Sequence, residues 1–406
     1  MKLLQTFADA GCASLSTFFV GLIALRVLSV GQLAFYAILF SAALVVMLVP
    51  QQTAFVPRRL KLNAESPGRR TGLRQDLRRA WPATVFAAAV LPLLTVPGLH
   101  LVSVRDFAVM TLTAMSWVMV SPVQDHLRSC MHIAGRHWMA GLMSAAMALV
   151  VAVTYILVTI LPGSSLFTLI PFGALAVSNL LTTILGSWLW RHLPAASWDA
   201  PRKFLRSFKY LTSDVLMQLY NYSANSVVSL ALGATALALL ETARIAAQPV
   251  LVLALALTTY YMPQAIRAFS RGDTRTLSTR LLRLTLVASG VGVIYSAALL
   301  ALGPLFAFVA GRPVDSMLAA TRAFGNSLQT TSSAFNQLYF ASGAVKGLVR
   351  NTLTSTAIGF AVLVVSIHWI GVFALPICLI LVSLIKAAFI ARDLVRGRFL
   401  PDSQSL

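Results

Sequence analysis

Runs of apolar residues, each about as long as a bilayer is thick, follow one another along almost the whole chain. A helix needs about 20 apolar residues to cross the hydrocarbon core of a membrane. Hydrophobic residues make up 58% of the 406 residues and charged residues only 11%, whereas a soluble domain has about a quarter charged residues. The sequence therefore predicts an all-α, polytopic membrane protein with about twelve transmembrane helices. The predicted spans are 8–28, 35–56, 81–101, 107–125, 138–162, 166–190, 211–233, 237–262, 284–309, 316–341, 351–370 and 372–391.

Basic residues are concentrated in alternate loops. Of the 32 Lys and Arg residues, 26 lie at the two termini or in loops after even-numbered spans, and only Arg105 and Arg312 lie in the other loops. Cytoplasmic loops of membrane proteins carry such an excess of positive charge. The pattern predicts that both termini are cytoplasmic. It also accounts for the net charge of +20 without a nucleic-acid partner, because no basic run is interleaved with aromatic residues.

The two halves of the sequence show the same order of spans and basic loops. Pro57 and Pro263 each lie at the cytoplasmic end of the second span in their half and are followed by arginine. At nearly the same offset, segment 130–138 pairs with segment 338–346 after the fourth span. Because each half has six spans, both have the same orientation in the membrane, which predicts a parallel repeat around a central cavity. The predicted six-helix bundles are residues 1–198 and 199–406, the second with a short cytoplasmic tail.

Three stretches resemble a known family of transporters. The segments 7–48, 128–150 and 204–246 are similar to the first helix pair, the junction of helices 4 and 5, and the entry to the second half of Wzx-type polysaccharide flippases. These flippases belong to the multidrug/oligosaccharidyl-lipid/polysaccharide exporter superfamily, which also contains drug antiporters. The residues that carry the resemblance are Arg26, Gly31, Phe35, Tyr36, Gly135 and Arg136.

The resemblance implies both a substrate and a location. The substrate would be an oligosaccharide linked to undecaprenyl diphosphate, which alternating access would move from the cytoplasmic to the outer leaflet of a bacterial inner membrane for polysaccharide biosynthesis. The implied partners are this lipid-linked glycan, membrane lipids, a polysaccharide polymerase and other biosynthesis proteins. A flippase of this kind is not an enzyme and needs neither a cofactor nor catalytic residues.

Polar residues line one face of two predicted spans. In span 7, Asn221 and Asn225 continue a series of polar positions at steps of three and four residues, and in span 10, Asn326 and Gln329 do the same. Such residues share one helix face. In a membrane, that face is expected to point toward protein or water rather than lipid. Two interpretations remain open, which are the lining of a substrate cavity and hydrogen bonding between helices.

Three arginines inside predicted spans are candidates for binding the diphosphate, because a guanidinium group can bind phosphate oxygens in a bidentate manner. They are Arg26, Arg244 and Arg322. Each also has another interpretation. Arg26 and Arg322 are close enough to a span end to reach the membrane surface, and Arg244 follows Glu241 by three residues, a spacing that suits an ion pair.

Two other functions remain open. A cation-coupled multidrug exporter of the same fold would need acidic groups in its cavity, for which Asp9, Asp214 and Glu241 are the candidates. A membrane-embedded glycan polymerase or acyltransferase is the other alternative, although the short outer loops leave no room for a catalytic chamber. The sequence has no P-loop, no Cys or His spacing typical of a metal site, and no pair of carboxylates suited to acid–base catalysis.

The twelve-span topology can be tested with reporter fusions. Fusions after residues 31, 103, 164, 235, 312 and 371 are expected to report the outside, because their loops have few basic residues. Fusions after residues 65, 132, 198, 273 and 346 are expected to report the cytoplasm. A fusion in a basic loop that reports the outside would contradict this topology.

Overall fold

The computed structural model describes residues 2–65, 72–160, 167–192, 208–342 and 344–395, and every regular element within these ranges is a helix. The prediction of an all-α protein is therefore confirmed. The α-helices are α1 (Lys2–Val27), α2 (Val30–Pro50), α3 (Val56–Glu65), α4 (Leu73–Thr95), α5 (Val104–Ile133), α6 (His137–Ile160), α7 (Ile170–Trp190), α8 (Phe208–Ala246), α9 (Gln248–Ser270), α10 (Thr274–Ala310), α11 (Ser316–Ala334), α12 (Asn336–Ala341), α13 (Val345–Ile370) and α14 (Ala374–Val395). The short elements are the π-helix η1 (Gln51–Phe55) and the 3₁₀ helices η2 (Val96–Leu101), η3 (Phe167–Leu169) and η5 (Gly371–Phe373).

The chain divides into two compact units, unit 1 (Met1–Ser229) and unit 2 (Leu230–Leu406). The division falls within α8, because the first part of this helix packs in unit 1. There the Tyr222 hydroxyl donates a hydrogen bond to the carbonyl oxygen of Leu94 at 2.6 Å, and the Asn225 amide donates one to the Ser41 hydroxyl at 2.7 Å. The boundary predicted between residues 198 and 199 lies outside the described residues, so the assignment of six helices to each half stays a prediction.

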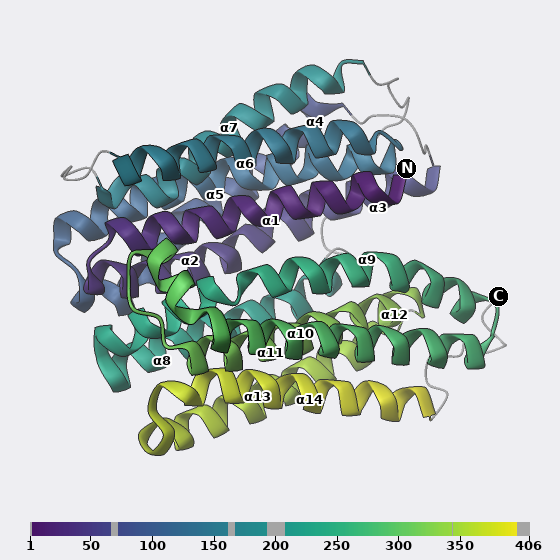
Figure 1. Cartoon of the computed structure of the whole chain (residues 1–406). Coiled ribbons are helices and arrows are strands. Elements are labelled where there is room, and N and C mark those ends of the chain that lie inside the picture. The colour runs from purple at the N-terminus through teal and green to yellow at the C-terminus, as the bar shows by residue number, and fades with distance from the viewer. Residues whose placement is uncertain (1, 66–71, 161–166, 193–207, 343, 396–406) are drawn as a thin grey trace. The chain divides into compact units, whose positions relative to one another are not determined.

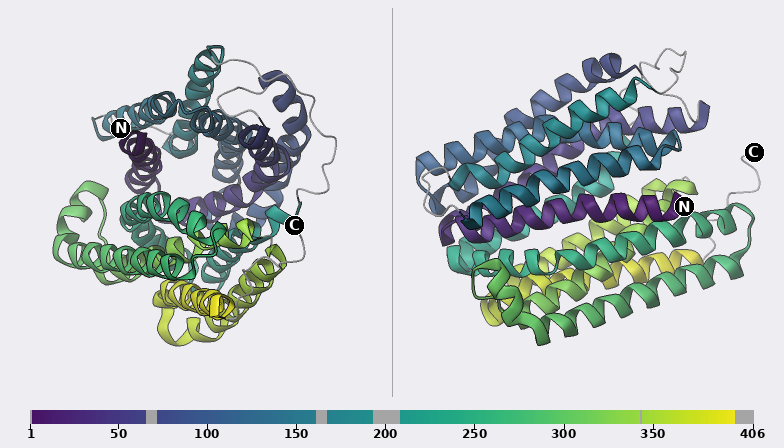
Figure 2. Two further views of the ribbon diagram at one scale, coloured as in Figure 1. Left: turned by 90° about the vertical axis from the view of Figure 1, so that its right-hand side faces the viewer. Right: turned by 45° about the horizontal axis from the view of Figure 1, so that its top comes forward.

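Unit 1 is built around aromatic side chains of α2. Within this unit the helices lie side by side, and the left view of Figure 2 looks nearly along their axes (Figures 1 and 2). Phe35 and Tyr36, which carry part of the family resemblance, are fully buried. The Tyr36 ring lies 5.0 Å from the Phe172 ring of α7, and the Phe40 ring stacks on Trp117 of α5 at 5.5 Å. Aromatic pairs at such separations add to the stabilisation from burial.

The helix packing of unit 2 repeats that of unit 1. In unit 2, α9 packs on α10 and α11, α10 packs on α11, and α14 packs on α11 and α13. Predicted spans 8 to 12 correspond to predicted spans 2 to 6 of the first half. The corresponding helix pairs of unit 1 are α2 with α4 and α5, α4 with α5, and α7 with α5 and α6, and all of these pairs are in contact. A parallel repeat predicts this correspondence.

Each of the twelve predicted spans overlaps a helix, but several boundaries differ. The predicted loops 57–80 and 126–137 are largely helical, because α3 and the ends of α4 and α5 extend through them. Their charged side chains pair with one another, which lets the helices continue. The predicted junction at Gly371 is confirmed, since α13 ends at Ile370 and Gly371 has a φ of +56°.

The number of membrane crossings stays a prediction. By length and composition, nine segments of the described chain can cross a membrane. Two of them, Val215–Ala254 and Lys346–Leu394, are 40 and 49 residues long, whereas one crossing needs about 20. The helix α11 is not among the nine, because its polar stripe lowers its hydropathy.

Side chains and glycine residues satisfy the backbone groups that have no hydrogen-bond partner at the helix ends. The hydroxyl of Ser103 caps α5 by accepting the Asp106 amide at 3.1 Å, and the Asp315 carboxylate caps α11 by accepting the Leu318 amide at 2.9 Å. These caps occupy corresponding places in the two halves, and each satisfies an amide that has no partner within its helix. At the other end of α5, Gly135 has a φ of +72° and closes the helix.

A break inside α8 depends on glycine. Gly233 has φ 82° and ψ −177°, although the residues around it are helical. This backbone conformation is essentially restricted to glycine, because a Cβ atom would strain it. The break separates the part of α8 that corresponds to predicted span 7 from the part that leads into α9. Gly233 therefore makes the turn that the sequence places between spans 7 and 8.

Substitution of Gly233 tests this break. Gly233→Ala is expected to destabilise the protein by about 1–3 kcal/mol, because alanine is strained at this φ and ψ. A Cβ atom at residue 233 would meet no other atom within 4 Å, so the effect would come from the backbone alone. The control is Gly290→Ala in α10, where a Cβ atom is equally unobstructed and φ is not positive. Thermal unfolding in detergent should show a lower midpoint for Gly233→Ala only; equal midpoints would contradict the strained turn.

Candidate functional site

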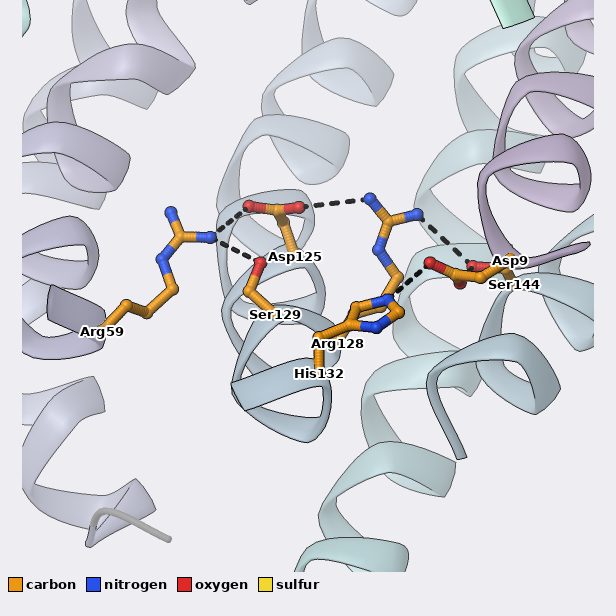
Figure 3. Close-up of polar contacts among 7 residues, drawn as sticks. All are labelled: Asp9, Arg59, Asp125, Arg128, Ser129, His132 and Ser144. Carbon is orange, nitrogen blue, oxygen red and sulfur yellow. Dashed lines mark hydrogen bonds and ion pairs between the residues drawn. The ribbon is translucent and has the colours of Figure 1, made fainter. Parts of the chain in front are cut away.

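Two clusters of charged residues occupy different faces of α5 in unit 1. The first face carries four polar residues at steps of three and four, so that they point the same way. Figure 3 shows these residues between Arg59 of α3 on one side and Asp9 of α1 on the other. We call this set, with Ser144 of α6, the α5 network. Its members are Asp9, Arg59, Asp125, Arg128, Ser129, His132 and Ser144.

One end of the α5 network surrounds a carboxylate of the first helix. Asp9 is 4% exposed. Its Oδ1 atom accepts a hydrogen bond from the Ser144 hydroxyl at 2.5 Å, and its Oδ2 atom lies 2.7 Å from Nε2 of His132. Arg128 donates to the same Ser144 hydroxyl at 3.3 Å. Ser144 thus connects the arginine to the carboxylate, and the contacts join α1, α5 and α6.

The other end of the network joins α3 to α5. The Nη1 atom of Arg59 lies 3.1 Å from Oδ2 of Asp125 and 2.6 Å from the hydroxyl of Ser129. The second carboxylate oxygen of Asp125 lies 3.5 Å from Nη2 of Arg128. Asp125 is therefore held between two arginines, and its charge offsets part of theirs.

A second face of α5, which carries His126, takes part in a more deeply buried cluster. His126 is fully buried and its Nε2 atom lies 3.1 Å from Oδ2 of Asp76 in α4. The other carboxylate oxygen of Asp76 accepts a 2.5 Å hydrogen bond from Nε of Arg58 in α3. The ring of Phe55 stacks on His126 at 4.5 Å. An ion pair with so little exposure depends on such hydrogen bonds to offset the loss of solvation.

Together the two clusters balance their charge. Three carboxylates, from Asp9, Asp76 and Asp125, face three guanidinium groups. In the hydrocarbon region, uncompensated charge is strongly unfavourable. The balance lets α1, α3, α4 and α5 carry charged residues at one end of unit 1, the end that the topology predicts to be cytoplasmic. The guanidinium groups belong to Arg58, Arg59 and Arg128.

Two histidines lie in a row beside Asp9. Nδ1 of His132 lies 2.9 Å from Nδ1 of His137, and His132 contacts Asp9 through its other nitrogen. Asp9, at one end of this row, is buried, while His137, at the other end, is half-buried. Among the described residues, no group of His, Cys, Asp or Glu has the arrangement of a metal site.

The described part of unit 2 has a smaller polar cluster where its fourth, fifth and sixth spans meet. The Asp393 carboxylate of α14 accepts hydrogen bonds from the hydroxyl of Tyr339 and the amide of Asn351, both at 2.9 Å. The Asn351 amide also lies 2.8 Å from the Tyr339 oxygen. These contacts tie α12, α13 and α14 together. The polar contacts of the two units thus join different sets of helices, α1, α5 and α6 in unit 1 and α12, α13 and α14 in unit 2.

Three of the predicted site residues lie in unit 1. Arg26 is exposed in the last turn of α1, with its guanidinium carbon 5.5 Å from the centre of the Tyr155 ring. Asn221 is half-buried in α8. Asn225 donates its hydrogen bond to Ser41 of α2, so it joins two helices, as the packing interpretation expects. The predicted role of these three residues in substrate binding stays a prediction.

The other four predicted site residues lie in unit 2. Arg244 binds the Glu241 carboxylate with two hydrogen bonds of 2.7 and 2.6 Å, which is the ion pair that the spacing of these residues suggested. Arg322 and Gln329 are half-buried in α11, and Asn326 between them is 3% exposed. Among the described residues, the Asn326 amide nitrogen has no hydrogen-bond partner. Three of these four residues therefore lie on α11, and Arg244 is bound in an ion pair.

Sequence analysis did not identify the α5 network as a site, although it counted Asp9 among the acidic candidates. Its arginines were assigned to cytoplasmic loops by their charge alone. A signal was present, because Asp125, Arg128, Ser129 and His132 recur at steps of three and four, the same periodicity that identified the stripes of spans 7 and 10. It was overlooked because the predicted helix ended at residue 125.

Comparison with known proteins identifies the fold. Neither a protein-family model nor a curated protein matches the chain. Solved structures of MATE family transporters match nearly its whole length. An outward-facing multidrug resistance MATE family transporter of the MOP superfamily has a TM-score of 0.64 at 16% identity, covering 98% of this chain and 96% of that one. The MATE transporter VcmN of Vibrio cholerae, in a mutant form, has 0.63 at 15%, covering 98% of each chain. The eukaryotic MATE transporter AtDTX14 has 0.65 at 13%, covering 97% and 95%.

These comparisons define a fold class. The chain has the fold of MATE transporters of the MOP superfamily, the wider group that the sequence resemblance indicated. At identities of 13–16% the similarity establishes the fold and leaves the substrate open. It supports a multi-pass membrane protein, in agreement with the long apolar helices.

The ion pair in α8 can be tested by a double-mutant cycle. The Glu241 side chain is 2% exposed and that of Arg244 is 20% exposed. Arg244→Gln is expected to destabilise the protein by about 3–5 kcal/mol, because it leaves a buried carboxylate without its partner. Changing Glu241→Gln as well should restore much of the stability, since no unpaired charge remains. Thermal unfolding in detergent measures both effects, and additive losses would contradict the pairing.

Proposed function

We propose that this protein is a flippase that moves a lipid-linked oligosaccharide, carried on undecaprenyl diphosphate, from the cytoplasmic to the outer leaflet of a bacterial inner membrane. The observation that carries this proposal is the polar stripe of α11, a helix packed among α9, α10 and α14. Asn326 is buried there, and its amide nitrogen has no hydrogen-bond partner among the described residues. A buried donor without a partner is unfavourable, and a polar ligand would satisfy it.

The chemistry of the stripe fits this substrate. Arg322 would bind the diphosphate, because a guanidinium group can make two parallel hydrogen bonds to phosphate oxygens. Asn326 and Gln329, one and two turns further along α11, would bind sugar hydroxyls. Asn221 and Asn225 in α8 and the arginines at positions 26 and 244 are the other proposed contacts, with Arg244 available only if its pair with Glu241 opens.

The proposed mechanism is alternating access. Two solved neighbours are described as inward-facing and outward-facing conformations of one type of transporter, and we extend this behaviour to the two predicted six-helix halves of this chain. An inside-negative membrane potential favours outward movement of an anion by about 2.3 kcal/mol per charge per 100 mV. The transport therefore needs neither a cofactor nor catalytic residues, and a polysaccharide polymerase would use the glycan that it delivers.

A second candidate function rests on the row of Asp9, His132 and His137. A buried carboxylate in contact with a row of two histidines suits a cation-coupled multidrug exporter of the same fold. Two of the solved neighbours are themselves described as multidrug resistance transporters. This candidate predicts that proton flow through Asp9 drives transport, whereas the flippase proposal depends on positive charge in α11.

The proposal is tested by glycan export in a strain that lacks the native gene. Arg322→Ala should abolish surface glycan while the protein remains inserted in the membrane. Arg322→Lys should restore export only partly, because an ammonium group keeps the charge and loses the bidentate geometry. Arg322→Gln should behave like Arg322→Ala, because glutamine is neutral.

The control variant is Arg105→Ala, which removes an exposed arginine near the start of α5 and should leave export unchanged. Membrane protein level is measured for every variant. Normal export by Arg322→Ala would refute the role of positive charge in α11. Loss of proton-dependent dye efflux in Asp9→Asn, together with normal export in Arg322→Ala, would establish the second candidate function.

A further inference from the structure

The hairpin of α9 and α10 contains a basic pocket that the proposed transport does not use. Four of its residues recur at steps of three and four on one face of α9 and the turn that follows, and two lie four residues apart in the first turns of α10. The pocket has a cavity volume of about 250 Å³. We call it the α9–α10 pocket, and its lining residues are Gln264, Arg267, Ala268, Arg271, Asp273, Thr276 and Arg280.

The backbone of the hairpin brings the arginines together. Gly272 has a φ of +71° and reverses the chain directly after α9, so Arg271 at the end of one helix faces Arg280 of the next across the pocket. Ala268, which is 6% exposed, forms part of the apolar packing of unit 2 below the pocket. Its small side chain leaves the hollow open. The pocket therefore lies between two rigid helices that the core of unit 2 holds in place.

The charge of the pocket is positive. Its lining contains three arginines and one carboxylate, Asp273. That carboxylate caps α10 by accepting the Thr276 amide at 2.9 Å. Hydrogen bonds from Thr276 and the positive charge of Arg271 hold the pKa of Asp273 below its usual value, so it is ionised at neutral pH. Two positive charges remain in excess, and they lie beside the N-terminus of α10, where the helix dipole also favours an anion.

The other polar groups of the pocket can accommodate phosphate oxygens. The Thr276 hydroxyl is exposed at the rim and can donate a hydrogen bond. The Gln264 amide nitrogen is engaged with the Tyr260 carbonyl at 3.2 Å, which leaves the guanidinium groups as the main donors. Pockets for drug-sized ligands enclose about 300–1,000 Å³. The volume here is smaller and matches a headgroup rather than a whole substrate.

We propose that the α9–α10 pocket binds the phosphate group of an anionic phospholipid headgroup at the membrane surface. The loop is predicted to be cytoplasmic, and the cytoplasmic leaflet is rich in anionic lipids that attract basic segments. The excess of arginine over carboxylate at a hollow of headgroup size distinguishes this site from basic residues that only orient the chain. Free phosphate has the same chemistry and is the alternative source of the ligand.

The test uses the full chain, purified in detergent, and native mass spectrometry to measure bound phosphatidylglycerol. Phosphatidylcholine at the same concentration serves as the zwitterionic comparison. The variant Arg271→Gln with Arg280→Gln is expected to weaken phosphatidylglycerol binding about tenfold, because two charge-assisted hydrogen-bond donors are lost. The matched control is Arg275→Gln with Arg283→Gln, which removes the same charge from exposed positions of α10 outside the pocket and should retain binding within about twofold.

A variant that keeps the charge of the pocket tests whether its shape is also needed. Thr276→Trp fills the rim without changing charge and should also weaken phosphatidylglycerol binding. Retention of the lipid in the presence of excess inorganic phosphate assigns the site to lipid headgroups, and displacement by phosphate assigns it to free phosphate. Equal losses in the pocket and control variants, or equal binding of phosphatidylglycerol and phosphatidylcholine, would overturn the site. This measurement involves no transport, so its failure would leave the proposed flippase function intact.

Discussion

Water is absent from the hydrocarbon core, so backbone and charged groups that enter it need partners within the protein. Helices satisfy the backbone along their length, and Ser103 and Asp315 complete this at helix ends. The same constraint acts on charge. Asp76 and Glu241 are almost fully buried, and each is bound by an arginine. The helices can therefore carry ionised side chains only where two or more elements bring opposite charges together, and these places connect the helices.

The helix α5 connects more charged elements than any other part of the described chain. Its two faces reach α1 and α6 through His132, α3 through Asp125, and α4 through His126. Asp9 contacts both His132 and Ser144, so one carboxylate links three helices of unit 1. In α11, by contrast, the buried polar groups are uncharged, and the half-buried Arg322 adds positive charge to this helix.

The two units share an order of packing but not a set of polar residues. The polar contacts join α1, α5 and α6 through Asp9, His132 and Ser144 in unit 1, and α12, α13 and α14 through Tyr339, Asn351 and Asp393 in unit 2. Packing order depends on the apolar surfaces of helices, which tolerate many substitutions of similar volume. Polar contacts depend on individual side chains. A repeat can therefore keep its architecture while its halves acquire different chemistry, and this accounts for the weak sequence identity between them.

The sequence by itself determined the fold class, because apolar runs of bilayer length admit only helices, and their repeated order with alternating basic loops indicated two similar halves. It also placed the polar stripe of α11, since helical periodicity can be seen in one segment. Tertiary structure decided which charges meet. The pairing of Arg244 with Glu241 was a local alternative that the sequence left open, whereas Asp9 and His132 are separated by 123 positions. No periodicity within one helix shows that two distant helices place their side chains together, because that contact depends on how the helices pack.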